Sequence, residues 1–235
     1  MHILHQLAAL GQSIWYDNIS RSMVRNGTLQ RMVDEGLLGV TSNPTIFDNA
    51  ISGSTDYDEQ ITTLVRAQPG ISTPALIRAL MEEDIRDAAD ILLPVYRRTG
   101  GKDGYISIEV DPTRARDTEG TIREAAEIWG SLRRPNVMIK IPATLEGLPA
   151  ITRTIAAGIN VNVTLIFSEP RYRQVVDAWM RGLEERVQHG QDVAGVASVA
   201  SVFVSRIDTM VDERLSGMAD RAAAEDAARL RALAG

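Results

Sequence analysis

Strand-like runs alternate with helical stretches along the chain, and this alternation limits the possible folds more than any other feature of the sequence. The runs are rich in β-branched and apolar residues and are bounded by glycine, proline or polar residues, which predicts strands. We place six of them, at residues 13–17, 39–43, 105–111, 137–142, 159–167 and 196–203. Such alternation predicts a parallel sheet with helices outside it, either doubly wound or closed into a barrel.

The stretches between the runs carry the spacing and the caps of helices. Apolar residues at helical intervals predict a long helix over residues 73–96, with Thr73 as its N-cap. Thr121 followed by Glu124 predicts a capping box, and Ser168 is expected to cap a further helix. The sequence after residue 206 is helical through residues 220–234, where Gly235 either caps the last helix or marks the end of the sequence.

Polar side chains fall at one parity in four of the predicted strands. They are Thr41, Asn43, Ser107, Glu109, Lys140, Asn160, Asn162 and Thr164. The opposite, apolar parity of the strand at 159–167 holds Val161, Val163, Leu165 and Phe167. Because successive side chains point to opposite faces, one face is dry and the other polar, whereas a sheet covered on both faces is almost wholly apolar. The pattern favours one ring of strands with a polar interior and a site at its carboxyl end. For any single residue, a satisfied hydrogen bond in the core is the alternative.

Lysine occurs at only two positions, so any amine chemistry has two candidates. Lys102 lies in a glycine-rich turn and is interpreted as solvated, whereas Lys140 lies within an apolar strand. Burial penalises the ammonium form, and a neutral amine attacks a ketone to give an iminium that lets a neighbouring C–C bond break. The alternative is a lysine that extends to water or pairs with an acid.

Two acids near strand ends, Asp17 and Glu109, suit the proton transfers that Schiff-base chemistry requires. The alternative is that these two carboxylates only form ion pairs with Lys140 or an arginine. Such pairing is compatible with a catalytic function.

Further polar residues suit the binding of a sugar phosphate. Asn43, Asn162 and Thr164 can hydrogen-bond sugar hydroxyls, although Asn43 before a proline equally suits a turn cap. Ser201 and Arg206 at the end of the last strand form a plausible phosphate grip, and a surface salt bridge is the ordinary alternative for Arg206.

Composition excludes several classes of function. The chain has no cysteine, which rules out disulfides, thiol catalysis and cysteine-bound metal, and its three histidines show no zinc spacing. A net charge of -6 argues against nucleic-acid binding. No run has the length of a membrane span, and no signal peptide is recognised. We therefore expect a cytoplasmic protein that binds neither nucleic acid nor membrane, and leave open whether it forms a homo-oligomer.

Five segments carry a resemblance to a known family. They are LGQSIWYD (10–17), GVTSNPTIF (39–47), VMIKIPATLEG (137–147), NVNVTLIFS (160–168) and SVASVFVSR (198–206). In these motifs and in their order the chain resembles the transaldolases, specifically the N-terminal portion of the longer bacterial type. The motifs cover nearly the whole chain.

The resemblance implies an α/β fold of the (β/α)8 TIM-barrel type and an enzyme, a transferase of the non-oxidative pentose phosphate pathway. It implies Schiff-base transfer of a dihydroxyacetone unit from sedoheptulose 7-phosphate or fructose 6-phosphate to glyceraldehyde 3-phosphate or erythrose 4-phosphate. It also implies that no metal and no organic cofactor takes part.

The resemblance also implies a role for each matching residue. Lys140 is the nucleophile, Asp17 the acid/base at C–C cleavage, and Glu109 with Thr164 handles a catalytic water. Substrate-binding roles fall to Thr41, Asn43, Asn162, Ser201, Phe203 and Arg206.

One departure from the family is the number of strands, since six are predicted here and eight in the family. We interpret residues 1–235 as a single incomplete β/α-barrel domain, truncated after the sixth unit, with open sheet edges. Two alternatives stay open beside a transaldolase. One is a related Schiff-base sugar-phosphate aldolase, and the other is a catalytically inactive binding or assembly module.

Overall fold

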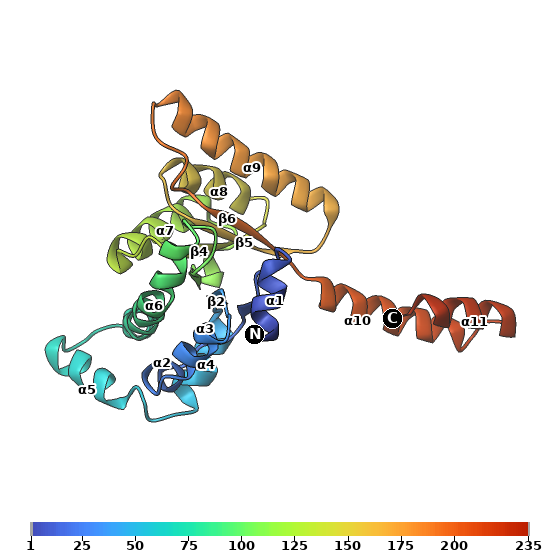
Figure 1. Ribbon diagram of the computed structural model, residues 1–235, viewed down its shortest axis with the longest axis horizontal. Helices are drawn as coiled ribbons and strands as arrows, with labels where there is room; N and C mark the ends of the chain where they lie inside the picture. The colour runs from blue at the N-terminus through green and yellow to red at the C-terminus, as the bar shows by residue number, and fades with distance from the viewer. Residues whose placement is uncertain (1, 235) are drawn as a thin grey trace.

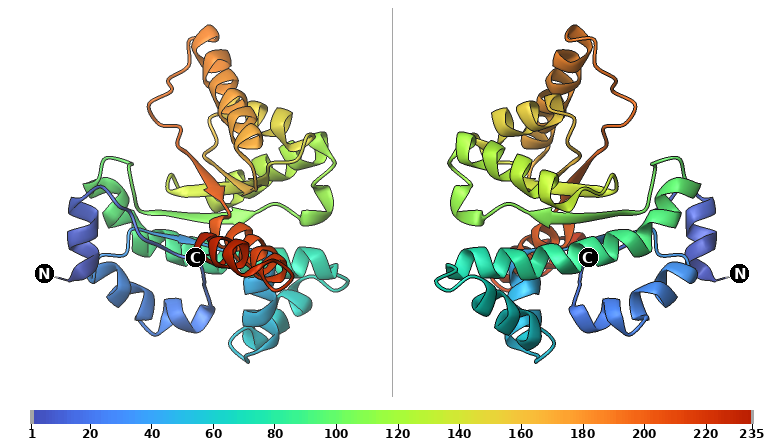
Figure 2. Two further views of the ribbon diagram at one scale, coloured as in Figure 1. Left: turned by 90° about the vertical axis from the view of Figure 1, so that its right-hand side faces the viewer. Right: turned by 90° about the vertical axis from the view of Figure 1, so that its left-hand side faces the viewer.

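Six parallel strands stand side by side in chain order in the computed structural model, which describes residues 2–234 (Figure 1). The strands are β1 (Trp15–Tyr16), β2 (Gly39–Thr41), β3 (Tyr105–Glu109), β4 (Val137–Pro142), β5 (Val161–Ile166) and β6 (Ser198–Val202). A doubly wound sheet changes direction partway through its strand order. The uninterrupted order therefore excludes that alternative, and the sheet is a curled half-barrel (Figure 2).

Helices occupy most of the connections between the strands. They are α1 (Ile3–Ala9), α2 (Arg21–Arg25), α3 (Thr28–Asp34), α4 (Pro44–Ser52), α5 (Asp58–Ala67), α6 (Thr73–Arg98), α7 (Thr118–Leu132), α8 (Gly147–Ala156), α9 (Glu169–Gln188), α10 (Val204–Ala219) and α11 (Ala224–Leu233), with a 3₁₀ turn η1 (Pro112–Arg114). None of the described helices is long and apolar enough to cross a membrane. The helical sequence predicted after residue 206 forms α10 and α11, with a turn at residues 220–223 where helix was expected, and Gly235 lies outside the described residues.

The outer face of the sheet carries the hydrophobic core. Leu92 of α6, Ile128 of α7 and Ile151 of α8 pack in one cluster with the outward side chains of the central strands. These outward side chains are at most 1% exposed, and in β3 to β5 they include Ile106, Ile108, Val137, Ile139, Ile141, Val161 and Val163. Burying a side chain of this size contributes roughly 1.5–3 kcal/mol, so the outer layer holds the strands while the inner face is free to be polar.

Two helix starts differ from the prediction because a neighbouring residue caps the helix instead. α6 is capped by Ser72 rather than Thr73. α7 is capped by Asp117, whose carboxylate accepts a hydrogen bond of 2.9 Å from the amide three residues later. Thr121 therefore lies inside α7, and the predicted capping box is wrong. The predicted cap of α9 is confirmed, since Ser168 Oγ accepts a hydrogen bond from the amide three residues on.

β5 departs from the predicted alternation of faces. Its pairing with β6 shifts register between Val163 and Ile166, and Leu165 in this interval has a φ of 60°. Ile166 is fully buried, while Leu165 and Phe167 are 40% and 45% exposed. The prediction that Leu165 and Phe167 share the dry face is wrong, because an extra residue at a β-bulge reverses the parity of all that follows.

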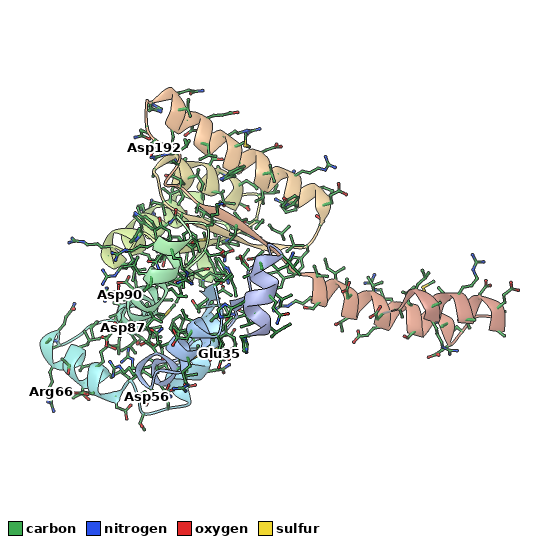
Figure 3. All side chains as sticks on the ribbon, in the orientation of Figure 1. Glu35, Asp56, Arg66, Asp87, Asp90 and Asp192 are labelled. Carbon is green, nitrogen blue, oxygen red and sulfur yellow. The ribbon has the colours of Figure 1, made fainter. Side chains whose placement is uncertain are left out.

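The last two helices form a hairpin that projects from the body (Figure 1). In the left view of Figure 2 this hairpin points toward the reader. Its side chains stand clear of the remaining helices along most of its length (Figure 3). Ala219 and Ala227 are its buried residues, so α10 and α11 mainly contact each other rather than the sheet.

Candidate active site

Three adjacent strands place polar side chains at one level of the inner face. Glu109 of β3 pairs in register with Lys140 of β4, and Lys140 pairs with Asn162 of β5. Neighbouring strands in a sheet lie about 4.8 Å apart, so residues far apart in sequence form one continuous row. The row consists of an amine flanked by a carboxyl on one side and an amide on the other.

Lys140 is 5% exposed, and its amine is enclosed between a carbonyl and a carboxylate. Nζ donates a 2.9 Å hydrogen bond to the backbone oxygen of Ser42 and lies 3.5 Å from Oε2 of Glu109. The predicted burial of Lys140 is confirmed, and so is its pairing with an acid, which had been the alternative to a catalytic role. Lys102, by contrast, is exposed, as expected for a solvated turn.

Glu109 holds its proton more tightly than an ordinary glutamate. Burial raises the pKa of this carboxyl, the charge of Lys140 opposes the rise without cancelling it, and the charge of Asp17 adds to it. Asp17 is exposed and directly follows β1, so a second acid acts on the site from another strand. A carboxyl with a raised pKa keeps its proton to higher pH than an ordinary glutamate, which suits it to donate a proton in catalysis.

A chain of hydrogen bonds crosses the inner face from the last strand to the amine. Ser201 Oγ donates to Asn162 Oδ1 at 2.8 Å, and Asn162 Nδ2 donates to Ser107 Oγ at 2.9 Å. Ser42 Oγ donates to the backbone oxygen of Ser107 at 2.7 Å, and the backbone oxygen of Ser42 accepts the hydrogen bond from Lys140 Nζ. The network orients both the amide and the amine, because each group in it has a directed partner.

Two serines of this network, Ser42 and Ser107, were not among the predicted site residues. Both are fully buried. Ser107 has the same strand parity as Glu109, which was a usable signal. Ser42 holds the amine through its main-chain oxygen, and no side-chain pattern reveals such a contact.

Asn43 serves as a helix cap, which was one of its two expected roles. Its Oδ1 accepts a 2.9 Å hydrogen bond from the amide of Ile46 at the start of α4. This bond uses the side-chain oxygen of Asn43 and not its amide nitrogen. Thr41, Asn162 and Ser201 line a hollow of about 430 Å³ on the inner side of the sheet.

Thr164 lies two residues beyond Asn162 in β5, on the same face of the strand, and is 2% exposed. It pairs with Pro142, and its carbonyl accepts a 2.8 Å hydrogen bond from the amide of Ala143. Its position is therefore tied to β4 immediately before the bulge at Leu165.

The remaining candidates lie farther out, where β6 ends. Phe203 follows β6, and its ring stacks on that of Phe167 with centroids 5.3 Å apart. Arg206 is exposed in the first turn of α10, with its guanidinium carbon 4.9 Å from the centre of the Phe203 ring. The structure thus joins Arg206 to the aromatic pair rather than to Ser201.

Comparison with known proteins places these residues in a family. Residues 14–233 match the family described as Transaldolase/Fructose-6-phosphate aldolase. A transaldolase of Thermobifida fusca is 52% identical over 229 residues, which is 97% of this chain and 61% of the relative. A transaldolase of Saccharopolyspora erythraea is 51% identical over 216 residues, which is 92% of this chain and 58% of the relative.

A third relative, the transaldolase of Mycobacterium bovis (strain BCG), is 48% identical over 233 residues, 99% of this chain and 61% of its own length. The chain thus spans 58–61% of the length of these three relatives. Because the family match and the identities extend over nearly every residue described, this chain belongs to the transaldolase/fructose-6-phosphate aldolase family.

Proposed function

We propose that this chain forms a Schiff base between Lys140 and the carbonyl carbon of a ketose phosphate, and transfers a dihydroxyacetone unit to an aldose phosphate. In the transaldolase direction, sedoheptulose 7-phosphate and glyceraldehyde 3-phosphate give erythrose 4-phosphate and fructose 6-phosphate. The carrying observation is an enclosed amine 3.5 Å from a carboxyl whose pKa is raised. Relatives named transaldolase lend further support.

The amine of Lys140 attacks the ketone carbon to give a carbinolamine, which loses water to give an iminium. Glu109 supplies the proton that turns the departing hydroxyl into water, because burial keeps this carboxyl ready to donate. Thr164 holds the same water beside Glu109. Ser42 steers the remaining N–H through its carbonyl.

Asp17 accepts the proton of the hydroxyl across the breaking C–C bond. The bond electrons pass to the iminium, an enamine forms on Lys140, and the shortened aldose leaves. The enamine then attacks the incoming aldehyde, whose oxygen takes the proton from Asp17, and a new iminium forms on Lys140. One water adds to this iminium with Glu109 as base, and the resulting carbinolamine breaks its C–N bond to release the new ketose and the free amine. The position of Asp17 suits this step, because Asp17 is exposed directly after β1 and its charge reaches Glu109.

The substrate hydroxyls bind to amide groups of the inner face. Asn162 is held by Ser107 and Ser201 and presents a fixed amide, while Asn43 offers its nitrogen and Thr41 its hydroxyl. The phosphate binds near Arg206, whose guanidinium lies over Phe203.

Borohydride reduction in the presence of fructose 6-phosphate tests this proposal, because it converts an iminium into a stable secondary amine. We expect peptide mass mapping to find the sugar adduct on Lys140 and to find none in Lys140→Met, which keeps the side-chain length and lacks the amine. Lys102→Met is the matched control, since it removes the other lysine from an exposed turn. Its adduct should be unchanged.

Labelling on Lys102 or on the terminal amine, or undiminished labelling of the Lys140→Met protein, contradicts the proposal. If no adduct forms at all, the result favours the remaining alternative, which is a non-catalytic binding or assembly module that keeps these polar groups as part of its interior.

A Schiff-base aldolase remains the second candidate, because the family description itself names fructose-6-phosphate aldolase beside transaldolase. The two differ in their need for an acceptor. Release of glyceraldehyde 3-phosphate from fructose 6-phosphate alone favours the aldolase, whereas turnover that depends on added erythrose 4-phosphate favours the transaldolase.

We also propose that the six strands are part of an eight-stranded ring, that residues 1–235 act as one domain, and that the protein works in the cytoplasm. The sequential parallel order supports the first statement. The absence of cysteine agrees with a reducing compartment.

A further inference from the structure

Leu165 has a backbone conformation that side chains rarely adopt. Its φ of 60° lies in the left-handed region, and among the described non-glycine residues only Arg133 shares this sign. Arg133 ends a helix, where such a conformation is common. Leu165 lies inside a strand and has no such explanation. A conformation of this kind persists only where its surroundings enforce it, and it concentrates at functional sites.

The strained residue is the centre of the bulge between β5 and β6. Val163 pairs with Ala200 and Ile166 with Val202, so Thr164 and Leu165 together face the single residue between. The amide of Phe203 then donates a 3.1 Å hydrogen bond to the oxygen of Ile166, which resumes the ladder. The extra residue is thus locked by regular pairing on both sides.

The bulge reverses which side chains face outward at the end of β5. Without it, the side chain two residues beyond Leu165 would share the buried outer face with Val163. With it, Ile166 takes that buried place and Phe167 becomes 45% exposed. Exposing an aromatic ring at the end of a core strand forgoes the gain from burying it. The ring is nevertheless placed where it has one aromatic partner, Phe203.

The Phe203 ring lies under Arg206 and is backed by the ring of Phe167. Phe167 and Phe203 stack at 5.3 Å with an interplanar angle of 28°, and the guanidinium carbon lies 4.9 Å from the Phe203 centroid. A guanidinium lying over a ring keeps its N–H groups directed outward, where they can meet a phosphate in a fork-like geometry. The stack also restricts a long side chain that is otherwise exposed.

We propose that Leu165 and Phe167 are positioning residues for phosphate binding by Arg206. The bulge at Leu165 brings Phe167 against Phe203, and the paired rings hold the guanidinium in place for the phosphate group of the substrate. This inference rests on the proposed function in taking Arg206 as the phosphate-binding residue. It predicts that two residues that need not touch the substrate set the preference for phosphorylated sugars.

Paired substitutions separate positioning from simple folding. Leu165→Gly keeps the left-handed conformation at no steric cost, whereas Leu165→Val places a β-branched side chain where it strongly resists that conformation. Phe167→Tyr keeps the stacked ring, and Phe167→Ala removes it. Tyr172→Ala is a matched control, because it removes another exposed aromatic ring from the neighbouring helix α9.

The first measurement is a titration with inorganic phosphate, in which phosphorus NMR gives the affinity. Arg206→Ala is the reference for loss of the site. We expect Leu165→Val and Phe167→Ala to weaken binding about twofold to fivefold, because both disturb the Phe203 ring and an exposed guanidinium–ring contact contributes about that much. Leu165→Gly, Phe167→Tyr and Tyr172→Ala should match the unaltered chain. Equal affinities for Leu165→Val and Leu165→Gly overturn the inference, and so does unchanged affinity in Arg206→Ala.

The second measurement compares borohydride trapping by fructose 6-phosphate with trapping by dihydroxyacetone, which carries no phosphate. We expect Leu165→Val and Phe167→Ala to reduce trapping by the phosphorylated sugar and to leave that by dihydroxyacetone unchanged. An equal reduction for both overturns the inference, because the defect then lies at the amine. If the unaltered chain traps neither compound, the proposed function fails, and the phosphate titration still decides the role of Leu165 and Phe167.

Discussion

Glu109 is the residue where the demands of folding and of chemistry oppose each other most directly. Burial raises its pKa, although an ammonium 3.5 Å away favours the charged form. The charge of Asp17 adds to the rise. A carboxyl that stays protonated at higher pH is useful as a proton donor, but its ionisation weakens the fold.

Glu109→Gln is therefore expected to become more stable relative to the unaltered chain as the pH rises. Above the ordinary glutamate pKa the unfolded chain releases the proton first, so the folded chain binds more protons and loses stability up to its own raised pKa. Glutamine does not titrate and escapes this loss. Urea unfolding of both proteins between about pH 4 and about pH 8 measures the difference, and a difference that does not change with pH contradicts the expectation.

Asp111 gives a contrast of opposite sign in the next loop. Hydrogen bonds from the hydroxyl and amide of Thr113, at 2.7 and 2.8 Å, lower the pKa of Asp111. Its contribution is present above the ordinary aspartate pKa and is lost as the pH falls through the lowered value. Asp111→Asn should accordingly lose stability relative to the unaltered chain as the pH rises to about 4, the ordinary aspartate pKa, and the difference should stay constant above it. Urea unfolding below about pH 4 measures this change, and a difference that instead develops at higher pH contradicts it.

At the residue scale, the sequence predicted those parts of the site that local pattern controls. The burial of Lys140 followed from its apolar neighbours, and Glu109 followed from strand parity. The contact of Lys140 with Ser42 did not, because it joins β4 to the end of β2 across the inner face. The distance between Lys140 Nζ and the Ser42 oxygen depends on how strongly the sheet curls, and no single stretch of sequence controls that curvature.

At the scale of elements, strands that are regular on both sides were the easiest to predict. β4 runs over the predicted residues 137–142, because apolar residues flank Lys140 on both sides and both neighbouring strands pair with β4 without interruption. The parity at the end of β5 could not be predicted, because the bulge exists only in its pairing with β6. Nothing in the sequence distinguishes Leu165 from an ordinary strand residue, but in the structure its backbone has a strained, left-handed conformation.

A buried ion pair fastens the helix after Asp17 to the long helix α6. Arg21 of α2 and Asp84 of α6 are each 1% exposed, with Nε and Oδ1 2.7 Å apart. The hydroxyl of Tyr57 donates to the other carboxylate oxygen at 2.8 Å, and its ring lies 4.3 Å from the guanidinium carbon. Asp84→Ala leaves this guanidinium buried without its charge partner, so we expect a loss of about 3–5 kcal/mol in urea unfolding.

The preceding residue on the same helix provides a matched control. Glu83 pairs with Arg25 at 2.8 Å and joins the same two helices, but these side chains are 32% and 52% exposed. Exposed pairs contribute at most about 1 kcal/mol, so Glu83→Ala should change stability by no more than that. Equal losses from Asp84→Ala and Glu83→Ala contradict the importance of burial.

At the scale of the whole molecule, burial of the strands falls from the middle of the sheet toward its edges. Every residue of β4 is buried, whereas β1 is half-buried and no residue of β6 is buried. The alternation of strand and helix predicted a parallel sheet, and the polar parity of four strands favoured a single ring of strands over a doubly wound order. Neither pattern predicted the placement of α10, because a helix after a parallel strand ordinarily packs back on the sheet, and this one projects with α11 instead (Figure 1).

The projecting hairpin should therefore open independently of the half-barrel. Cooperative opening is resisted by buried apolar contacts, and the hairpin buries only Ala219 and Ala227 among its described residues. In hydrogen exchange followed by mass spectrometry, we expect amides of α10 and α11 to exchange on the order of a thousandfold faster than those of β4. Low urea should accelerate exchange in β4, which requires global unfolding, and leave the hairpin nearly unchanged. Protection of α10 equal to that of the buried helix α8 contradicts independent opening and indicates that α10 packs against the sheet in solution.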